Sequence, residues 1–155
     1  RWPQAEALLA GASQLFVLGR GPGLAIAQEA ALKFKEVCGL QAEAFSGAEV
    51  QHGPMALVGE GWPVLVLAPR GPAQRGLVEV AQRLAARGAK VMVAAAAGTP
   101  GLDGLLHLPL TPSGHEDLDA IAAVQTFYPM VEALARLRDR DPDAPPHLAK
   151  VTRTH

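Results

Sequence analysis

The sequence predicts a doubly wound α/β domain, in which helices cover both faces of a parallel sheet. Two observations support this fold. Short apolar runs are typical of strands buried on both faces, and helical patterns lie between and after these runs. Strands that alternate with helices imply βαβ units with right-handed crossovers. The predicted strands are 15–18 (LFVL), 63–68 (PVLVLA), 90–94 (KVMVA) and 105–110 (LLHLPL).

The predicted helices have recognisable ends. Ser113 and Glu116 have the spacing of a capping box at the start of the last helix. Gly88 fits the C′ position after the third helix, and the prolines of 141–146 stop the last one. We expect helices over 3–9, 24–38, 73–87 and 116–138.

The composition limits the possible functions. The 155 residues suit one domain, and 14 Lys and Arg against 15 Asp and Glu indicate neither a nucleic-acid-binding surface nor a membrane anchor. The longest apolar runs, such as 91–97, are far shorter than the roughly 20 residues of a membrane span. Cys38 is the single cysteine, which fits a cytoplasmic location, and we expect it to be buried. Because the chain opens at Arg1 before a helical pattern, we expect it to be a domain of a longer protein.

The loop 19–23 (GRGPG) joins the first strand to the next helix. Backbone amides at a helix start can bind an anion, so NAD or ATP binding is one interpretation. The loop lacks the GxGxxG spacing, no GK[ST] follows, and no hydroxyl is present to contact a phosphate. A tight strand-to-helix turn, with Pro22 in the first helical turn, is the simpler interpretation.

The segment 29–36 (EAALKFKE) carries a line of charges. Glu29, Lys33 and Glu36 are spaced four and three residues apart, so they lie on one face of a helix. An ordinary solvated ion pair, worth roughly 0.2–0.5 kcal/mol, would explain this spacing.

The neighbours of this line favour a second interpretation. Ile26 and Leu32 flank the charges, and the opposite face already offers a full apolar surface to the core. The charged line is therefore expected to face a pocket or a subunit interface, where a carboxylate beside a lysine can be tuned for proton transfer. The residues of the opposite face are Ala27, Ala31, Phe34 and Cys38.

Two further residues are candidates for chemistry. His52 ends a short helical segment in 46–54, and imidazole can move a proton near neutral pH, although a lone histidine is more often a surface residue. Lys150 follows a proline-stiffened tail and could carry an amine into a site, or it could be a solvated charge. His107 and His115 are expected to be structural. No zinc-ligand spacing and no GxSxG motif is present, so we expect no metal site.

Five motifs follow one another along the chain, and their order and spacing resemble those of a sugar isomerase (SIS) domain. The resemblance is closer to the second of the two SIS domains in the isomerase part of glutamine–fructose-6-phosphate aminotransferase, and to the related glucosamine-6-phosphate deaminases. It runs over 15–154 and implies a flavodoxin-like parallel sheet and a sugar-phosphate substrate. The motifs are LGRG (18–21), EAALKFKE (29–36), AEA (42–44), EVQHGP (49–54) and LAK (148–150).

The resemblance implies a role for each candidate residue. Glu36 resembles the carboxylate that moves a proton between C1 and C2 of the sugar, and Lys33 resembles the residue that holds sugar oxygens. His52 resembles the ring-opening residue, which in the family reaches a neighbouring subunit's site. Lys150 resembles the tail lysine that engages the keto sugar at C2, and Glu29 resembles a residue that orders this tail. Ala149, in the same motif, is expected to contact substrate.

The resemblance also implies partners. The chain would be one half of an isomerase, and its partners would be the first SIS domain, which holds the family's phosphate loop, and a second copy in a homodimer with a shared site. No cofactor is implied. The helix and the tail are expected to close one site at the carboxyl side of the sheet. A non-catalytic SIS module that senses a sugar phosphate is the alternative, and the last six residues lean slightly towards the deaminases.

Overall fold

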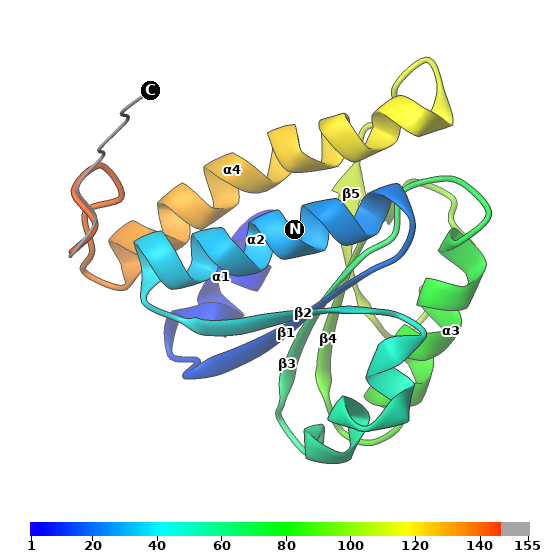
Figure 1. The fold of residues 1–155 in the computed structure, drawn as a ribbon, viewed down its shortest axis with the longest axis horizontal. Helices are drawn as coiled ribbons and strands as arrows, with labels where there is room; N and C mark the ends of the chain where they lie inside the picture. The colour runs from blue at the N-terminus through cyan, green and yellow to red at the C-terminus, as the bar shows by residue number, and fades with distance from the viewer. Residues whose placement is uncertain (147–155) are drawn as a thin grey trace, which may run out of the picture.

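A computed structural model of the chain describes residues 1–146 and shows a five-stranded, fully parallel sheet (Figure 1). The strand order is β2-β1-β3-β4-β5, which is the flavodoxin-like order and confirms the predicted fold class. The predictions for Lys150 and Ala149 lie outside the described residues. The strands are β1 (Gln14–Gly19), β2 (Gln41–Ser46), β3 (Pro63–Leu67), β4 (Lys90–Ala96) and β5 (Leu106–Leu110).

Helices cover both faces of this sheet. Helices α1 (Trp2–Ala10), α2 (Pro22–Cys38) and α4 (Asp119–Leu137) lie on one face, and α3 (Gln74–Ala85) lies on the other (Figure 1). The alternation of side chains along each strand produces two cores, since Leu15 and Val17 of β1 face α2 and α4, whereas Phe16 and Leu18 face α3. The described residues also form three short 3₁₀ helices: η1 (Glu49–His52), η2 (Pro54–Leu57) and η3 (Glu116–Leu118). No helix within 1–146 is long and apolar enough to cross a membrane.

Strand β2 is the element that the sequence analysis missed. It forms the edge of the sheet, and its pairing with β1 runs from Gln41 opposite Gln14 to Ser46 opposite Gly19. Its inward positions include Ala42, and Gln41 and Glu43 point to solvent. Alanine contributes little apolar signal and has a low strand propensity, so the alternation in this strand is hard to see in the sequence.

Helix α2 packs against the sheet and against α4 at the same time. Phe34 of α2 meets Phe127 of α4 edge to face, with ring centroids 5.3 Å apart. Ile26 is buried in the same core cluster as these two rings. The prediction that no core is left for Ile26 to cover was therefore wrong. The cause is α4, which widens the buried arc of α2. Leu32 is 43% exposed, as that prediction required.

The turn between β1 and α2 depends on a glycine. A Cβ atom on Gly19 would lie 2.1 Å from the carbonyl oxygen of Gly23. Gly21 has a φ of +57°, and Pro22 begins the helix. The amides of Gly23 and Leu24 donate to carbonyls inside the turn. These bonds support the interpretation of 19–23 as a tight turn, because they occupy amides that a nucleotide phosphate would need.

Gly19→Ala should therefore lower the free energy of unfolding by about 2–3 kcal/mol, because the new methyl group collides with main-chain atoms that cannot move aside cheaply. Urea denaturation of the two chains would measure this loss. Gly11→Ala is the matched control, since no atom lies within 4 Å of the Cβ position there. Equal stabilities for the two variants would contradict the close approach at Gly19.

Candidate functional site

Three charged side chains form an acid–base line on the outward side of α2. The Nζ atom of Lys33 lies 2.5 Å from Oε2 of Glu36 and 3.9 Å from Oε1 of Glu29. All three side chains are between 25% and 32% exposed, so they are neither buried nor freely solvated. The hydrogen bond to Glu36 raises the pKa of Lys33; partial burial opposes this increase, and the negative charges of Glu36 and Glu29 add to it. The lysine is therefore a stable cation.

A fourth polar group joins this line from another helix. The hydroxyl of Tyr128, in α4, donates a hydrogen bond of 3.0 Å to Oε1 of Glu29. This bond raises the pKa of Tyr128 above its ordinary value. Tyr128 could not be identified from the sequence, because 99 residues separate it from Glu29 and the packing of α4 on α2 brings the two together.

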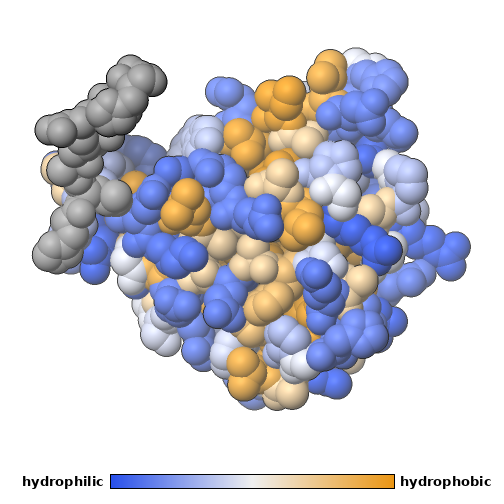
Figure 2. Space-filling model, viewed as in Figure 1, coloured by the Kyte–Doolittle hydropathy of each residue, from blue (hydrophilic) through white to orange (hydrophobic). Residues whose placement is uncertain are grey.

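The position of the line differs from the predicted one. Helix α2 starts where β1 ends and runs back, antiparallel to the strands, to the residues that begin β2. Lys33 and Glu36 are in the second half of α2, so they lie towards the amino ends of the strands. The expectation of a site at the carboxyl side of the sheet was therefore wrong for these two residues. On the face seen in Figure 2, hydrophilic and hydrophobic residues lie side by side.

His52 lies apart from the acid–base line. It is the exposed last residue of η1, which follows the carboxyl end of β2, and β2 separates it from the end of α2. The described residues of this single chain thus bring Glu29, Lys33 and Glu36 together and leave His52 outside the group.

The carboxyl side of the sheet has a hollow of its own. Its volume is about 570 Å³, and Arg20, Gln51 and Arg83 contribute polar groups to its lining. It lies beyond the end of β1, near the point where the strand order reverses between β1 and β3. None of the predicted site residues within 1–146 lines it.

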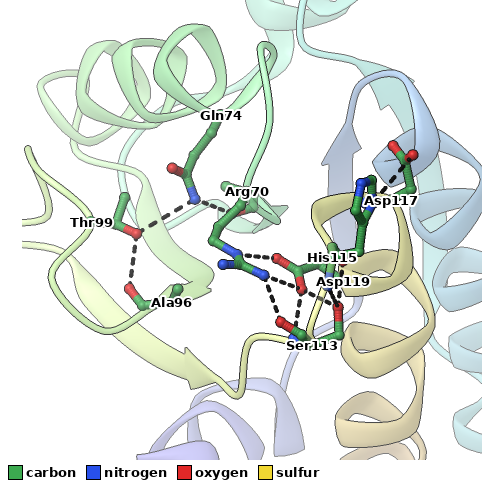
Figure 3. Close-up of polar contacts among 9 residues, drawn as sticks. Arg70, Gln74, Ala96, Thr99, Ser113, His115, Asp117 and Asp119 are labelled. Atoms are coloured by element: carbon green, nitrogen blue, oxygen red, sulfur yellow. Dashed lines mark hydrogen bonds and ion pairs between the residues drawn. The ribbon is translucent and has the colours of Figure 1, made fainter.

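A charged network fastens the loop after β3 to the start of α4 (Figure 3). Arg70 donates to both carboxylate oxygens of Asp119, at 2.6 and 3.0 Å. Ser113 adds its amide and its hydroxyl as donors to Oδ1 of Asp119, each at 2.7 Å. Arg70 and Ser113 therefore hold the pKa of Asp119 below its ordinary value. The predicted capping box was wrong, because Ser113 bonds to Asp119 and not to the amide of Glu116.

The other candidates for chemistry are structural. His107 bonds through Nε2 to the carbonyl of Ala95, and His115 accepts a hydrogen bond from the amide of Asp117. Cys38 is buried, as predicted, and burial raises its pKa to about 11, so its thiol is not a nucleophile at neutral pH. Within 1–146, no group of three or more His, Cys, Asp and Glu side chains could hold a metal ion.

The model of the SIS domain family matches residues 8–99. The chain belongs to the SIS domain family. This match covers the first four strands, the acid–base line and His52. The family assignment agrees with the flavodoxin-like strand order and with the resemblance seen in the sequence.

Relatives of this SIS domain are longer proteins. The chain is 40% identical, over 95% of its length, to a glutamine–fructose-6-phosphate aminotransferase of Aeropyrum pernix, and it spans 24% of that protein. It superimposes with a TM-score of 0.82 on the C-terminal domain of a glucosamine–fructose-6-phosphate aminotransferase from Francisella tularensis, at 25% identity, over 90% of this chain and 40% of that one. A Silicibacter pomeroyi protein assigned as a phosphosugar isomerase gives the same TM-score at 44% identity, over 92% and 42% of the two chains.

Asp119→Asn should lower the free energy of unfolding at pH 7 by about 1–3 kcal/mol, because it removes a carboxylate that accepts charged hydrogen bonds. The folded-state pKa of Asp119 lies below the unfolded value of about 3.9, so this stabilisation is present above about pH 4 and is lost as pH falls through the folded value. Urea denaturation at pH 7 and at about pH 3 would measure both effects.

The exposed Asp117 provides the control, since Asp117→Asn removes a charge from the same segment without touching Arg70. A stability difference between wild type and Asp119→Asn that stays constant from pH 7 to about pH 3 would contradict the proposal that ionisation of Asp119 stabilises the fold.

Proposed function

We propose that this SIS domain supplies the acid–base groups of an aldose–ketose isomerase that acts on hexose 6-phosphates in amino-sugar metabolism. One observation carries the proposal: Glu36 and Lys33 lie in direct hydrogen-bond contact on an outward line of α2 and are only partly exposed. A carboxylate and an ammonium ion at this separation can act on the carbon and oxygen of one carbonyl group. The relatives support this class of substrate, because they are named as aminotransferases of fructose 6-phosphate.

Glu36 is the base of the proposed mechanism. Its carboxylate takes the proton from C1 of the open-chain ketose, and the C–H electron pair forms the C1=C2 bond of an enediol-like state while the C2 oxygen gains negative charge. Lys33 donates a hydrogen bond to that oxygen. Glu36 then returns the proton to C2 while the proton of the C1 hydroxyl passes to the C2 oxygen, so that C1 becomes the aldehyde carbon of the aldose. A positioned acid–base group of this kind accelerates such a step by about 10²–10⁴-fold.

The remaining residues act around this step. Before the proton transfer, the amine of Lys150 adds to the C2 carbonyl of the open sugar, water leaves, and a Schiff base forms; hydrolysis of this Schiff base then restores the C2 oxygen that Lys33 contacts. Ala149 contacts the sugar, and Glu29 orders the tail that carries both residues. His52 opens the sugar ring in the site of a neighbouring copy, which agrees with its position away from the acid–base line.

The proposed reaction requires another domain or subunit that encloses the acid–base line. The chain spans 24% of the Aeropyrum relative and 40–42% of the two solved chains. We infer that residues 1–155 are one SIS domain, that its intramolecular partner is a first SIS domain, and that two parent chains form a dimer with a shared site. The partly exposed line on α2 supports this arrangement, because an isomerase must exclude water from the reacting carbons.

Glu36→Gln, in the full-length parent protein, should abolish the exchange of solvent deuterium into C2 of glucosamine 6-phosphate, because the amide cannot accept the proton. Sugar-phosphate binding should survive, because glutamine is nearly isosteric. Deuterium uptake would be followed by NMR in D₂O, and binding by calorimetry. Glu79→Gln is the matched control, since it changes an exposed ion pair on α3.

Exchange at the wild-type rate in Glu36→Gln would show that another group is the base. If the wild-type parent binds sugar phosphate but shows no exchange, the domain is a sensor and not a catalyst.

Lys150→Ala should remove the covalent adduct that borohydride traps between the parent protein and fructose 6-phosphate, because the ε-amino group that forms the Schiff base is gone. Mass spectrometry of the reduced protein would detect the adduct. Lys35→Ala, which removes an exposed lysine of α2, should leave the adduct intact. An adduct of undiminished yield in Lys150→Ala would assign the Schiff base to a different amine.

A further inference from the structure

Lys33 has two carboxylates within reach on the same helix. Glu29 is four residues before it and Glu36 is three residues after it, and both spacings allow an ion pair. The structure is nevertheless asymmetric, because the Lys33 ammonium lies 2.5 Å from Glu36 and 3.9 Å from Glu29. A contact from outside α2 accounts for this difference.

Tyr128 provides that contact. Its hydroxyl donates to Oε1 of Glu29 at 3.0 Å, and this is the same oxygen that lies 3.9 Å from Lys33. The hydrogen bond gives the Glu29 carboxylate a partner on α4, so this oxygen does not need to turn towards the ammonium ion.

We propose that Tyr128 is a positioning residue, which holds Glu29 away from Lys33 and so leaves the lysine paired with Glu36. The inference rests on the proposed function in one respect: Glu36 is taken as the base, and Lys33 as the group that stabilises the charge of the enediol-like state. Tyr128 acts through Glu29 and does not itself touch the sugar.

The surroundings of Tyr128 suit this role. The preceding residue, Phe127, is fully buried against Phe34 of α2, so the backbone of α4 is fixed at this point relative to α2. Tyr128 itself is 42% exposed, which lets its hydroxyl reach the acid–base line from the side. Because Glu29 raises the pKa of Tyr128, the phenol stays protonated and remains a donor at neutral pH.

Loss of the hydroxyl has a specific consequence. Glu29 would be free to close on Lys33, and the ammonium would then divide its hydrogen bonds between two carboxylates. The pair that acts on C1, C2 and the C2 oxygen would lose its geometry. Binding of the sugar phosphate does not depend on this pair alone. The rate of the chemical step should therefore fall more than the affinity for the sugar phosphate.

The first test is a double-mutant cycle in the full-length parent protein. Tyr128→Phe should lower kcat for isomerisation about tenfold, within the range that a displacement of about 1 Å produces, with less than a twofold change in KM. In a Glu29→Gln background the same substitution should change kcat by less than twofold, because the competing carboxylate is absent. Ile121→Ala, an exposed position on the same helix, should have no effect in either background.

An equal loss of kcat from Tyr128→Phe in both backgrounds would overturn the proposal, since a general structural role does not depend on Glu29. No loss in the wild-type background would overturn it as well.

The second test does not depend on activity. In a crystal structure of the Tyr128→Phe parent protein, Oε1 of Glu29 should lie within about 3 Å of the Lys33 ammonium. A separation that stays at 3.9 Å would show that the phenol does not hold Glu29. The two failures can be told apart. If only the proposed function is wrong, Glu29 still moves towards Lys33 in the Tyr128→Phe protein, but the Glu36→Gln protein retains deuterium exchange.

Discussion

Helix α2 is buried from two directions, by the sheet and by α4, and this packing decides which of its side chains meet the surface. Three alanines let the helix approach its neighbours closely, and Phe34 fills the space between them. Full burial of a side chain such as Phe34 contributes about 1.5–3 kcal/mol to the stability of the folded state. Glu29, Lys33 and Glu36 form a partly exposed line beside the exposed positions of α2, which include Gln28 and Lys35. The alanines are Ala27, Ala30 and Ala31.

The acid–base line lies on a helix flank and not among the loops at the carboxyl edge of the sheet. Loops there usually hold the ligand of a doubly wound fold, and the hollow beside Arg20 and Arg83 occupies that place. A flank has the advantage of rigidity, because a helix fixes the spacing of its side chains better than a loop does. Its disadvantage is openness, which is why the proposal assigns the enclosing surface to a companion domain.

The sequence was informative where burial imposes a pattern. Strands buried on both faces read as continuous apolar runs, so β1, β3 and β4 could be predicted, and helical spacing placed Glu29, Lys33 and Glu36 on one line. Edge strand β2 was missed because alanines line its inner face. The burial of Ile26 and the contact of Tyr128 with Glu29 could not be predicted, since both depend on how α4 lies on α2.

Local spacing also misled in one place. Ser113 and Glu116 have capping-box spacing, but the hydroxyl of Ser113 bonds to Asp119, whose charge and burial make it the stronger acceptor. Local spacing is also a poor guide for His52. It lies beyond β2 and does not contact the acid–base line of the same chain, so its proposed role requires a second copy of the protein.

The most direct measurement is a crystal structure of the parent protein with fructose 6-phosphate bound in its open form. If the α2 line is the acid–base centre, a carboxylate oxygen of Glu36 will lie about 3–3.5 Å from C1 or C2, and the Lys33 ammonium will contact the oxygen on C2. A sugar whose C1 and C2 lie away from α2, for example in the hollow beyond β1, would contradict the assignment.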